Sequence, residues 1–386
     1  MVHIDSFRGR AALTIAQGCA VIEIGALPLW MGSLIGHYGF DPQEAGSMVS
    51  LYMAGAVLSG FVVAPLFGRL SSGRAIVTIG LAFAAVVFFT LAGSSSYTEM
   101  ALLHLVGGLS IGPALAVSVG TVGRSSNPHQ LFAITAVASS LTAAIFLGIM
   151  PRLVDAHGGQ LVFQAIAAIF AFGSAIALLS FPQAPLLQSE KLSTEPDQRQ
   201  NKIPRKVWFG FTGVFCLSVI FSMTMSFVER VGMDRGYGLV AVSLVLTIMA
   251  IAKMFPAAIA GLLQKRLTVR TALFASPVVQ ALASGSIFAV PVFAVYAIAA
   301  PIFIMPMLFA QVFAFGLISK LEPSGRASAL IPSISMLGAV VGPTLGGTIV
   351  IAAGYSGLAT VSFILAAFAL FFFARLTSGG REATSI

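Results

Sequence analysis

Three ionisable side chains fall within long apolar stretches of this chain: Glu23, His104 and Lys253. A charge that faces lipid in the middle of a membrane costs roughly 3 kcal/mol even on the most lenient scale. These side chains are therefore expected to face a protein interior or a water-filled cavity. In such a place a carboxylate like Glu23 can take up and release a proton near physiological pH. The alternative is a fixed ion pair of Glu23 with Lys253 that only sets the helix register.

The two basic candidates indicate different chemistry. A histidine titrates near neutral pH, so His104 can relay a proton or contact an anion. Its position about one turn from the outer boundary of its stretch also fits a solvated histidine at the membrane surface. Lys253 lies past the middle of its stretch, where a lysine cannot easily reach either surface. It can bind a substrate carboxylate or pair with Glu23. Glu229 and Arg230 end another stretch and are predicted to form a pair at the outer rim.

Twelve apolar stretches are predicted to position these residues as membrane spans. At about 1.5 Å per residue, the stretch 11–35 can cross a hydrocarbon layer of roughly 30 Å with Glu23 near its middle. The predicted spans are 11–35, 45–66, 75–92, 100–122, 131–154, 160–181, 207–227, 239–263, 273–290, 293–318, 327–353 and 358–373. The sequence therefore predicts an all-α membrane protein with twelve transmembrane helices.

The composition agrees with a membrane protein. Of the 386 residues, 58% are hydrophobic and 9% are charged, and the mean hydropathy is +0.97, whereas soluble domains are about one quarter charged. The net charge of +8 comes from basic residues scattered over short loops, which excludes a nucleic-acid-binding patch. In the predicted topology 17 of the 21 lysines and arginines fall on the side of the N-terminus. This bias predicts that both termini are cytoplasmic.

A polar segment divides the chain into two similar halves. Residues 183–206 are predicted to be a cytoplasmic linker between bundles of six helices at 1–182 and 207–386. At an offset of 197 residues, Cys19 matches Cys216, Gly39-Phe40 matches Gly236-Tyr237, and Arg69-Leu70 matches Arg266-Leu267. Two pseudo-symmetric bundles that face one another would enclose a central cavity. Both cysteines lie in apolar stretches, so neither a disulfide nor a cysteine metal site is expected.

Two glycine-containing motifs give the layout a resemblance to a known family. The first is Pro65-Leu-Phe-Gly-Arg69-Leu-Ser-Ser-Gly73-Arg74, and the second runs from Gly338 to Gly347. With the twelve spans and the linker, they resemble the major facilitator superfamily of secondary transporters. The first motif lacks the family's acidic residue, because Gly68 stands in its place. Its arginines Arg69 and Arg74 either bond carbonyls at helix C-termini or only anchor the loop.

The second motif predicts close helix packing. It contains the glycines and the proline Gly338, Gly342, Pro343, Gly346 and Gly347. Glycines four residues apart allow two helices to approach closely, and the proline leaves a helix carbonyl unpaired. Packing alone and a gating role are both consistent with this pattern.

The resemblance also implies roles for residues within the spans. His104-Leu-Val-Gly-Gly108 is similar to a fourth-helix motif in which the family has an arginine linked to proton transfer. Several exporters of the family have an acidic residue in the first helix, and Glu23 is such a residue in this chain. Proton coupling is thus assigned to Glu23 and His104. Substrate contacts are assigned to these residues of the presumed cavity helices: Glu23, Lys253, Gln17, Trp30, Met223 and Gln311.

The resulting expectation is a proton-coupled transporter of the bacterial inner membrane. We expect it to be monomeric and to export a lipophilic or amphipathic organic compound by antiport with protons. The main alternative is symport of an organic anion held by Lys253 and His104, and a membrane sensor that does not transport is a more remote one. The sequence contains no nucleotide-binding loop, nucleophile motif or metal-ligand cluster, so neither an enzyme nor a cofactor is expected.

Overall fold

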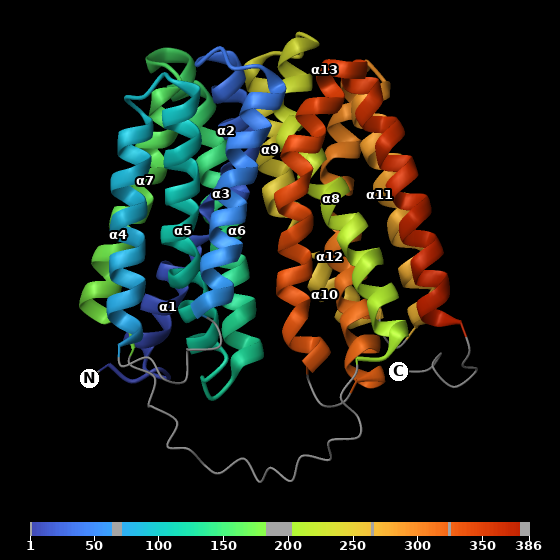
Figure 1. The fold of residues 1–386 in the computed structure, drawn as a ribbon, viewed down its shortest axis with the longest axis horizontal. Coiled ribbons are helices and arrows are strands. Elements are labelled where there is room, and N and C mark those ends of the chain that lie inside the picture. The colour runs from blue at the N-terminus through green and yellow to red at the C-terminus, as the bar shows by residue number, and fades with distance from the viewer. Residues whose placement is uncertain (1, 64–71, 183–202, 264–265, 323–325, 379–386) are drawn as a thin grey trace.

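The computed structural model describes residues 2–63, 72–182, 203–263, 266–322 and 326–378. Every regular element within these ranges is an α-helix, and the helices run roughly parallel to one axis of the molecule (Figure 1). Arg69 and most of the predicted linker lie outside the described residues. The prediction of an all-helical protein is confirmed.

The first half of the chain forms seven helices in the described residues. The predicted first span is divided between α1 and α2. The helices are α1 Phe7–Ala20, α2 Ile22–Gly36, α3 Pro42–Val63, α4 Gly73–Leu91, α5 Tyr97–Val122, α6 Pro128–His157 and α7 Gln160–Ser180.

The second half continues in the same manner. Its helices are α8 Arg205–Asp234, α9 Leu239–Ala252, α10 Pro256–Leu263, α11 Val269–Ala289, α12 Phe293–Leu321 and α13 Arg326–Thr377. The long α13 consists of two helical segments joined at a kink, where Gly354 has φ 65°. Figure 1 shows these two segments running in opposite directions.

Ten described segments are long and apolar enough to cross a membrane. The count differs from the predicted twelve for two reasons. Leu239–Ala252 falls short because the eighth predicted span is divided between α9 and α10. Residues Ile334–Thr377 count as one segment although the chain turns at Gly354.

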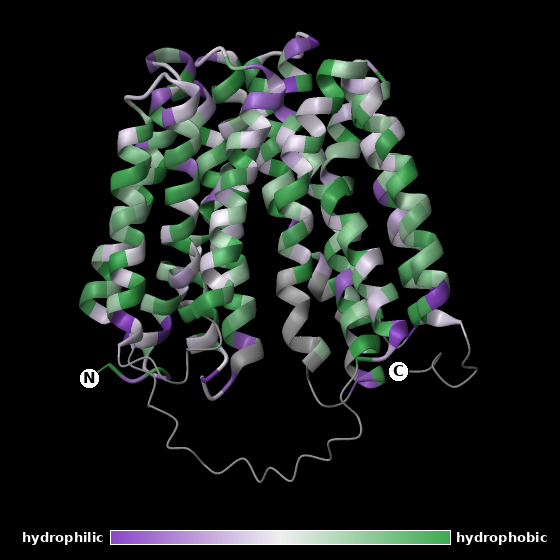
Figure 2. Cartoon of the chain, viewed as in Figure 1, coloured by the Kyte–Doolittle hydropathy of each residue, from purple (hydrophilic) through white to green (hydrophobic). Residues whose placement is uncertain are grey.

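The sides of the molecule are apolar and its two ends are polar. Figure 2 shows hydrophobic residues along the helices and hydrophilic residues gathered near both ends. Large apolar side chains such as Leu58, Phe83, Phe89 and Ile298 are exposed on this outer surface. Such a surface is unstable in water and suits contact with lipid.

One end of the molecule, which we call the terminal end, contains the start of α1 and the end of α13 (Figure 1). There Arg8 donates to the Ser180 hydroxyl at 2.9 Å, joining the start of α1 to the end of α7. Lys206 donates to the Ser378 carbonyl at 2.9 Å, which joins the start of α8 to the end of α13. At the terminal end, each of these two bonds thus joins helices of the same half.

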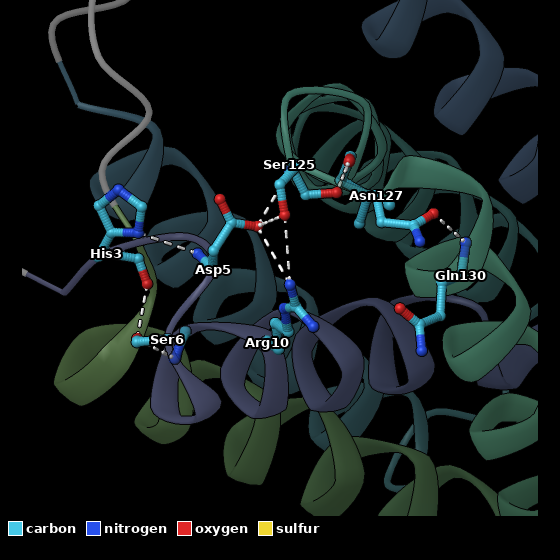
Figure 3. Close-up of polar contacts among 10 residues, drawn as sticks. His3, Asp5, Ser6, Arg10, Ser125, Asn127 and Gln130 are labelled. Atoms are coloured by element: carbon cyan, nitrogen blue, oxygen red, sulfur yellow. Dashed lines mark hydrogen bonds and ion pairs between the residues drawn. The ribbon is translucent and has the colours of Figure 1, made fainter.

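Figure 3 shows a second set of polar contacts near the start of α1. The Asp5 carboxylate accepts hydrogen bonds from the backbone N–H and the hydroxyl of Ser126, at 2.9 and 2.7 Å, and pairs with Arg10 at 3.4 Å. Ser126 lies in the loop between α5 and α6. The bonds from Ser126, with the Arg10 charge, hold the pKa of Asp5 below its ordinary value.

The opposite end, which we call the distal end, is where the two halves contact one another. The Thr344 N–H of α13 donates to the Ser50 hydroxyl of α3 at 3.2 Å. Gly46 of α3 packs against the Pro343 carbonyl, and Gly347 of α13 packs against the Pro42 carbonyl. Backbone thus meets backbone across the halves, since no side chain intervenes at these glycines.

Candidate functional site

Glu23 lies at a break in the middle of the first predicted span. The helical pattern is interrupted at Val21, and Glu23 follows in the first turn of α2. The first N–H groups of a helix have no intrahelical partner and attract negative charge. Glu23 is 3% exposed, and its Oε2 has no hydrogen-bond partner in the described part of the chain. The start of α2 therefore supports a carboxylate in an otherwise apolar setting.

Lys253 lies at a matching break in the other half. It caps the C-terminus of α9, and α10 begins after it at Pro256. The last carbonyl groups of a helix attract positive charge. Glu23 and Lys253 thus stand at helix ends of the appropriate polarity.

A cavity lies beside both breaks. Its wall is formed by residues of α2, α6, α8, α9 and α12 together with Val21, so both halves contribute. Among the described residues that line it, Lys253 is the charged one, and Ser139 and Ser140 of α6 are the hydroxyl groups. The remaining wall is apolar and includes Phe221 and Met225. Such a cavity suits a ligand with an apolar body and one anionic group.

Glu23 does not line the cavity, but it interacts electrostatically with Lys253 of the cavity wall. Both are described, yet no N–O distance within 4.0 Å joins them. The fixed ion pair considered from the sequence is therefore absent in this conformation. The Tyr52 hydroxyl is also buried, has no hydrogen-bond partner among the residues that the structure describes, and lies within electrostatic range of Glu23. The carboxylate and the ammonium group are each left available for another partner.

His104 is buried away from this cavity. Its Nδ1 lies 2.6 Å from the Met100 carbonyl, so Nδ1 carries the proton, and its Nε2 accepts the indole N–H of Trp30 at 3.1 Å. The Trp30 ring stacks on the imidazole with centroids 5.3 Å apart. Both ring nitrogens are occupied in the neutral form. The exposed, solvated histidine considered from the sequence is wrong, and a proton relay would require these bonds to break.

The other predicted substrate residues do not line the cavity. Trp30 packs among aromatic rings of the first half, and Met223 is buried near Gly346 between α8 and α13. Gln311 donates to the Ser335 hydroxyl at 3.2 Å. Gln17 has a buried side-chain oxygen that finds no hydrogen-bond partner within the described ranges. Their substrate contacts remain predictions for another conformation.

Sequence reasoning missed the serine pair of the cavity wall. Ser139 and Ser140 form a polar dipeptide within the otherwise apolar fifth predicted span. This dipeptide could have indicated a polar part of the cavity wall from the sequence alone. The helix break beside Lys253 could also have been predicted, because Pro256 follows Lys253 within three residues.

The glycine motif of the eleventh predicted span contacts two different helices, α8 and α3. Gly338, Gly342 and Gly346 pack against α8, where an added Cβ at Gly342 would lie 2.6 Å from the Ser222 Cβ. The Ser222 hydroxyl donates to the Ala339 carbonyl at 3.0 Å. This is the carbonyl that Pro343 leaves without its helix partner. This face provides the predicted close packing.

The other face of the motif carries Pro343, Thr344 and Gly347, which contact α3 of the first half. Packing within one half and contact between the halves therefore share one short stretch of α13. A gating role for the motif stays a prediction. Arg74, the described arginine of the loop motif, donates to the Phe181 carbonyl at the C-terminus of α7 at 3.1 Å. That contact lies within the first half.

Glu229 differs from its predicted position. Instead of forming a rim pair with Arg230, it is buried on α8 against the backbone of Gly32 in α2. Arg230 pairs with Asp234 at 3.0 Å, one turn further along α8. The prediction was wrong because α8 continues to Asp234, seven residues beyond the predicted end of its span.

Similar proteins place this fold in a family. The Major Facilitator Superfamily profile matches residues 13–324. The structure of nucleoside transporter NupG is similar with a TM-score of 0.77 at 16% identity, covering 96% of this chain and 99% of that chain. A POT family transporter in complex with a thioalcohol conjugated peptide has a TM-score of 0.76 at 15% identity, covering 98% and 99%.

A third similar structure is a bacterial homolog of the human lysosomal transporter Spinster, in an inward-facing and unoccupied conformation. Its TM-score is 0.73 at 12% identity, covering 96% of both chains. Among curated proteins, none matches the sequence. At these identities the solved structures establish a shared fold, and the profile match covers most of the chain. The chain therefore belongs to the Major Facilitator Superfamily, a family of membrane transporters.

Proposed function

We propose that this protein is a proton-coupled transporter of an amphipathic organic anion. The observation that carries the proposal is Lys253, the charged side chain on an otherwise mostly apolar cavity wall, within electrostatic range of the buried Glu23 of the other half. A carboxylate ligand would contact Lys253, and its apolar body would contact residues such as Phe221 and Met225.

The charges of the site suggest how the proton is coupled. An anion beside Lys253 repels the Glu23 carboxylate, so the loaded site favours a protonated Glu23. When the anion leaves, Glu23 releases its proton and takes over the interaction with Lys253. Substrate and proton then travel in the same direction.

The movement is proposed to be alternating access between two bundles of six helices. Twelve spans result if α1 and α2 form one span, α9 and α10 form another, and α13 forms two spans joined at Gly354. The positive-inside bias favours a cytoplasmic terminal end. Because the halves meet at the distal end, we assign this conformation to the inward-facing state. We also propose a monomer in the bacterial inner membrane with both termini cytoplasmic.

A second candidate is export of a lipophilic compound by proton antiport. It is favoured by the apolar wall, which binds an uncharged or cationic body as readily as an amphipathic one. In that cycle a proton on Glu23 would displace the substrate. The two candidates differ in the relative direction of proton and substrate.

Proton movement in oriented proteoliposomes distinguishes the candidates. We would add amphipathic carboxylates, lipophilic cations and neutral lipophiles separately, and record internal pH with wild type, Glu23→Gln and Lys253→Gln. Symport predicts protons moving with a carboxylate, loss of gradient-driven accumulation in Glu23→Gln with counterflow retained, and loss of carboxylate binding in Lys253→Gln. Glu99→Gln, an exposed acid at the start of α5, is the matched control and should behave as wild type.

Two outcomes of this experiment would contradict the symport proposal. Protons moving against a lipophilic compound, and stopping in Glu23→Gln, would replace the symport proposal with the antiport candidate. Wild-type flux that is unaffected by a proton gradient would overturn both.

A further inference from the structure

Glu229 is a buried carboxylate that the proposed transport cycle does not use. It is 8% exposed and lies on α8 at the distal end, where α8 packs against α2 of the other half. Among the described residues its Oε2 has no hydrogen-bond partner. An ionisable group thus occupies the contact between the halves.

The groups that face Glu229 do not neutralise it directly. On α2 it meets the backbone of Gly32, and an added methyl group there would collide with Oε2. On its own helix, Arg230 and Asp234 are within electrostatic range, but their charges pair with one another at 3.0 Å.

Two tyrosines complete the surroundings. On α12, the Tyr296 hydroxyl lies in electrostatic range of Glu229 but donates to the Val228 carbonyl at 2.9 Å. On α13, Tyr355 donates to Asp234 at 2.6 Å. At the end of α2, His37 lies against Gly159 of the α6–α7 connection. The two tyrosine hydroxyls are therefore engaged elsewhere, and His37 is an exposed side chain.

The closed contact therefore accommodates the acid better than the carboxylate. A buried anion without a direct cation partner is costly, whereas a neutral carboxyl group buries one hydroxyl and one carbonyl. Separation of α2 from α8 would expose the same group to water on the distal side, where the anion is stable. Closure and protonation are then linked, because each favours the other.

We propose that Glu229 is a proton-binding latch of the distal contact. One proton from water on the distal side binds the carboxylate when α2 and α8 close, and it returns to that water when they separate. The latch rests on the proposed alternating access, but it is independent of the substrate and of the proton carried by Glu23. A second titrating acid of the transport cycle is thereby assigned to the second half.

A distance measurement across the distal end tests the latch. Spin labels would be placed at Ser95 and Val292, both exposed in loops of opposite halves, in a Cys19→Ala, Cys216→Ala background. Label distances would be recorded in nanodiscs from pH 5 to pH 9 without substrate. Wild type should show the short distance at low pH and a growing long-distance population at high pH.

Variants of Glu229 give the decisive comparison. Glu229→Gln imitates the protonated acid and should keep the short distance at every pH, whereas Glu229→Asp should retain a pH response. Glu99→Gln, an exposed acid at the start of α5, is the control and should follow wild type. An unchanged pH response in Glu229→Gln, or a wild-type distance that ignores pH, would overturn the latch.

A substitution on the opposite helix keeps the test valid if Glu229→Gln does not fold. Gly32→Ala should push the carboxylate out of the contact and move the opening midpoint down by about one pH unit, a tenfold change in proton affinity. Gly18→Ala, whose added methyl group finds its nearest neighbour at 3.7 Å, should leave the midpoint unchanged. A midpoint unmoved by Gly32→Ala would contradict the proposal.

Failure of the latch can be told from failure of the proposed transport. Glu23→Gln should remove proton-coupled flux but preserve the distal pH response. Glu229→Gln should remove the distal pH response whatever substrate is carried.

Discussion

At the scale of single residues, burial separates two kinds of polar side chain. His104 and Trp30 satisfy one another, because each ring nitrogen of the histidine and the indole N–H has a partner. Glu23 and Glu229 are buried too, yet each has a carboxylate oxygen with no partner among the described residues. Satisfied buried groups stabilise a fold, whereas unsatisfied ones mark places where a proton, a ligand or a movement completes the bonding.

The His104–Trp30 pair predicts a stability effect without a transport effect. His104→Leu should lower the free energy of unfolding by about 1–3 kcal/mol, because the Trp30 N–H is left buried and unpaired. The double variant Trp30→Phe/His104→Leu should lose less than the sum of the two single variants, as thermal unfolding would show. Proton coupling that disappears in correctly folded His104→Leu would restore the relay role.

The Asp5 carboxylate predicts a pH effect at the terminal end. Its lowered pKa means that its bonds to Ser126 stabilise the fold above the ordinary carboxyl pKa and are lost as the pH falls through the lowered value. The protection of the Ser126 amide, its intrinsic exchange rate at each pH divided by its measured rate, should therefore fall in acid. Asp5→Asn should exchange faster at neutral pH and respond less to acid, whereas equal responses in both proteins would contradict this assignment.

At the scale of elements, the helices of this protein are defined as much by their breaks as by their lengths. The breaks at Val21 and after Ala252 turn two apolar spans into helix ends beside Glu23 and Lys253. Gly39 and Gly236, with φ of 76° and 71°, end equivalent connections after α2 and α8. Their shared conformation at an offset of 197 residues supports the internal repeat.

The glycine face of α13 predicts a packing effect. Gly342→Ala should lower the free energy of unfolding by about 1–3 kcal/mol, since its Cβ would lie 2.7 Å from the Met223 backbone nitrogen. Gly316→Ala on α12 is the matched control, because nothing lies within 4 Å of its added Cβ. It should unfold at the wild-type temperature or above it. A Gly342→Ala protein that unfolds at the wild-type temperature or above it would contradict this packing effect.

The sequence predicted the spans better than the site. Runs of apolar residues predict the bounds of helices such as α5 and α7 closely, because a membrane helix depends on local composition. The break at Val21 has no proline or glycine at that position to announce it. The approach of Glu23 to Lys253, and of Glu229 to Gly32, joins residues more than 190 positions apart. Such contacts depend on how the halves dock, which local composition does not encode.

At the scale of the whole molecule, the two halves are joined at the distal end by small residues and backbone atoms. Contacts such as Thr344 with Ser50 bury no large interlocking side chain. An interface of this kind fits the proposed exchange between conformations. The polar contacts at the terminal end, by contrast, tie helices together within each half.

This arrangement predicts that a distal crosslink stops transport. Ser50→Cys and Thr344→Cys, joined by a short thiol-reactive bifunctional reagent that a reductant can cleave, should hold the distal end closed. Flux into proteoliposomes should disappear and return after reduction, while substrate binding from the terminal side persists. Either cysteine alone, treated identically, should transport normally. Full flux through the crosslinked protein would exclude opening at this contact.

The aromatic surroundings of Trp30 have an optical consequence. The chain contains two tryptophans, and Trp208 is half exposed at the start of α8. In a Trp208→Phe protein, all indole emission comes from Trp30, whose ring neighbours Tyr52, Phe88, His104 and Phe163 belong to the first half. If that half moves as a rigid body, its fluorescence stays constant throughout transport. A change in emission therefore identifies internal deformation of the first half, without any attached label.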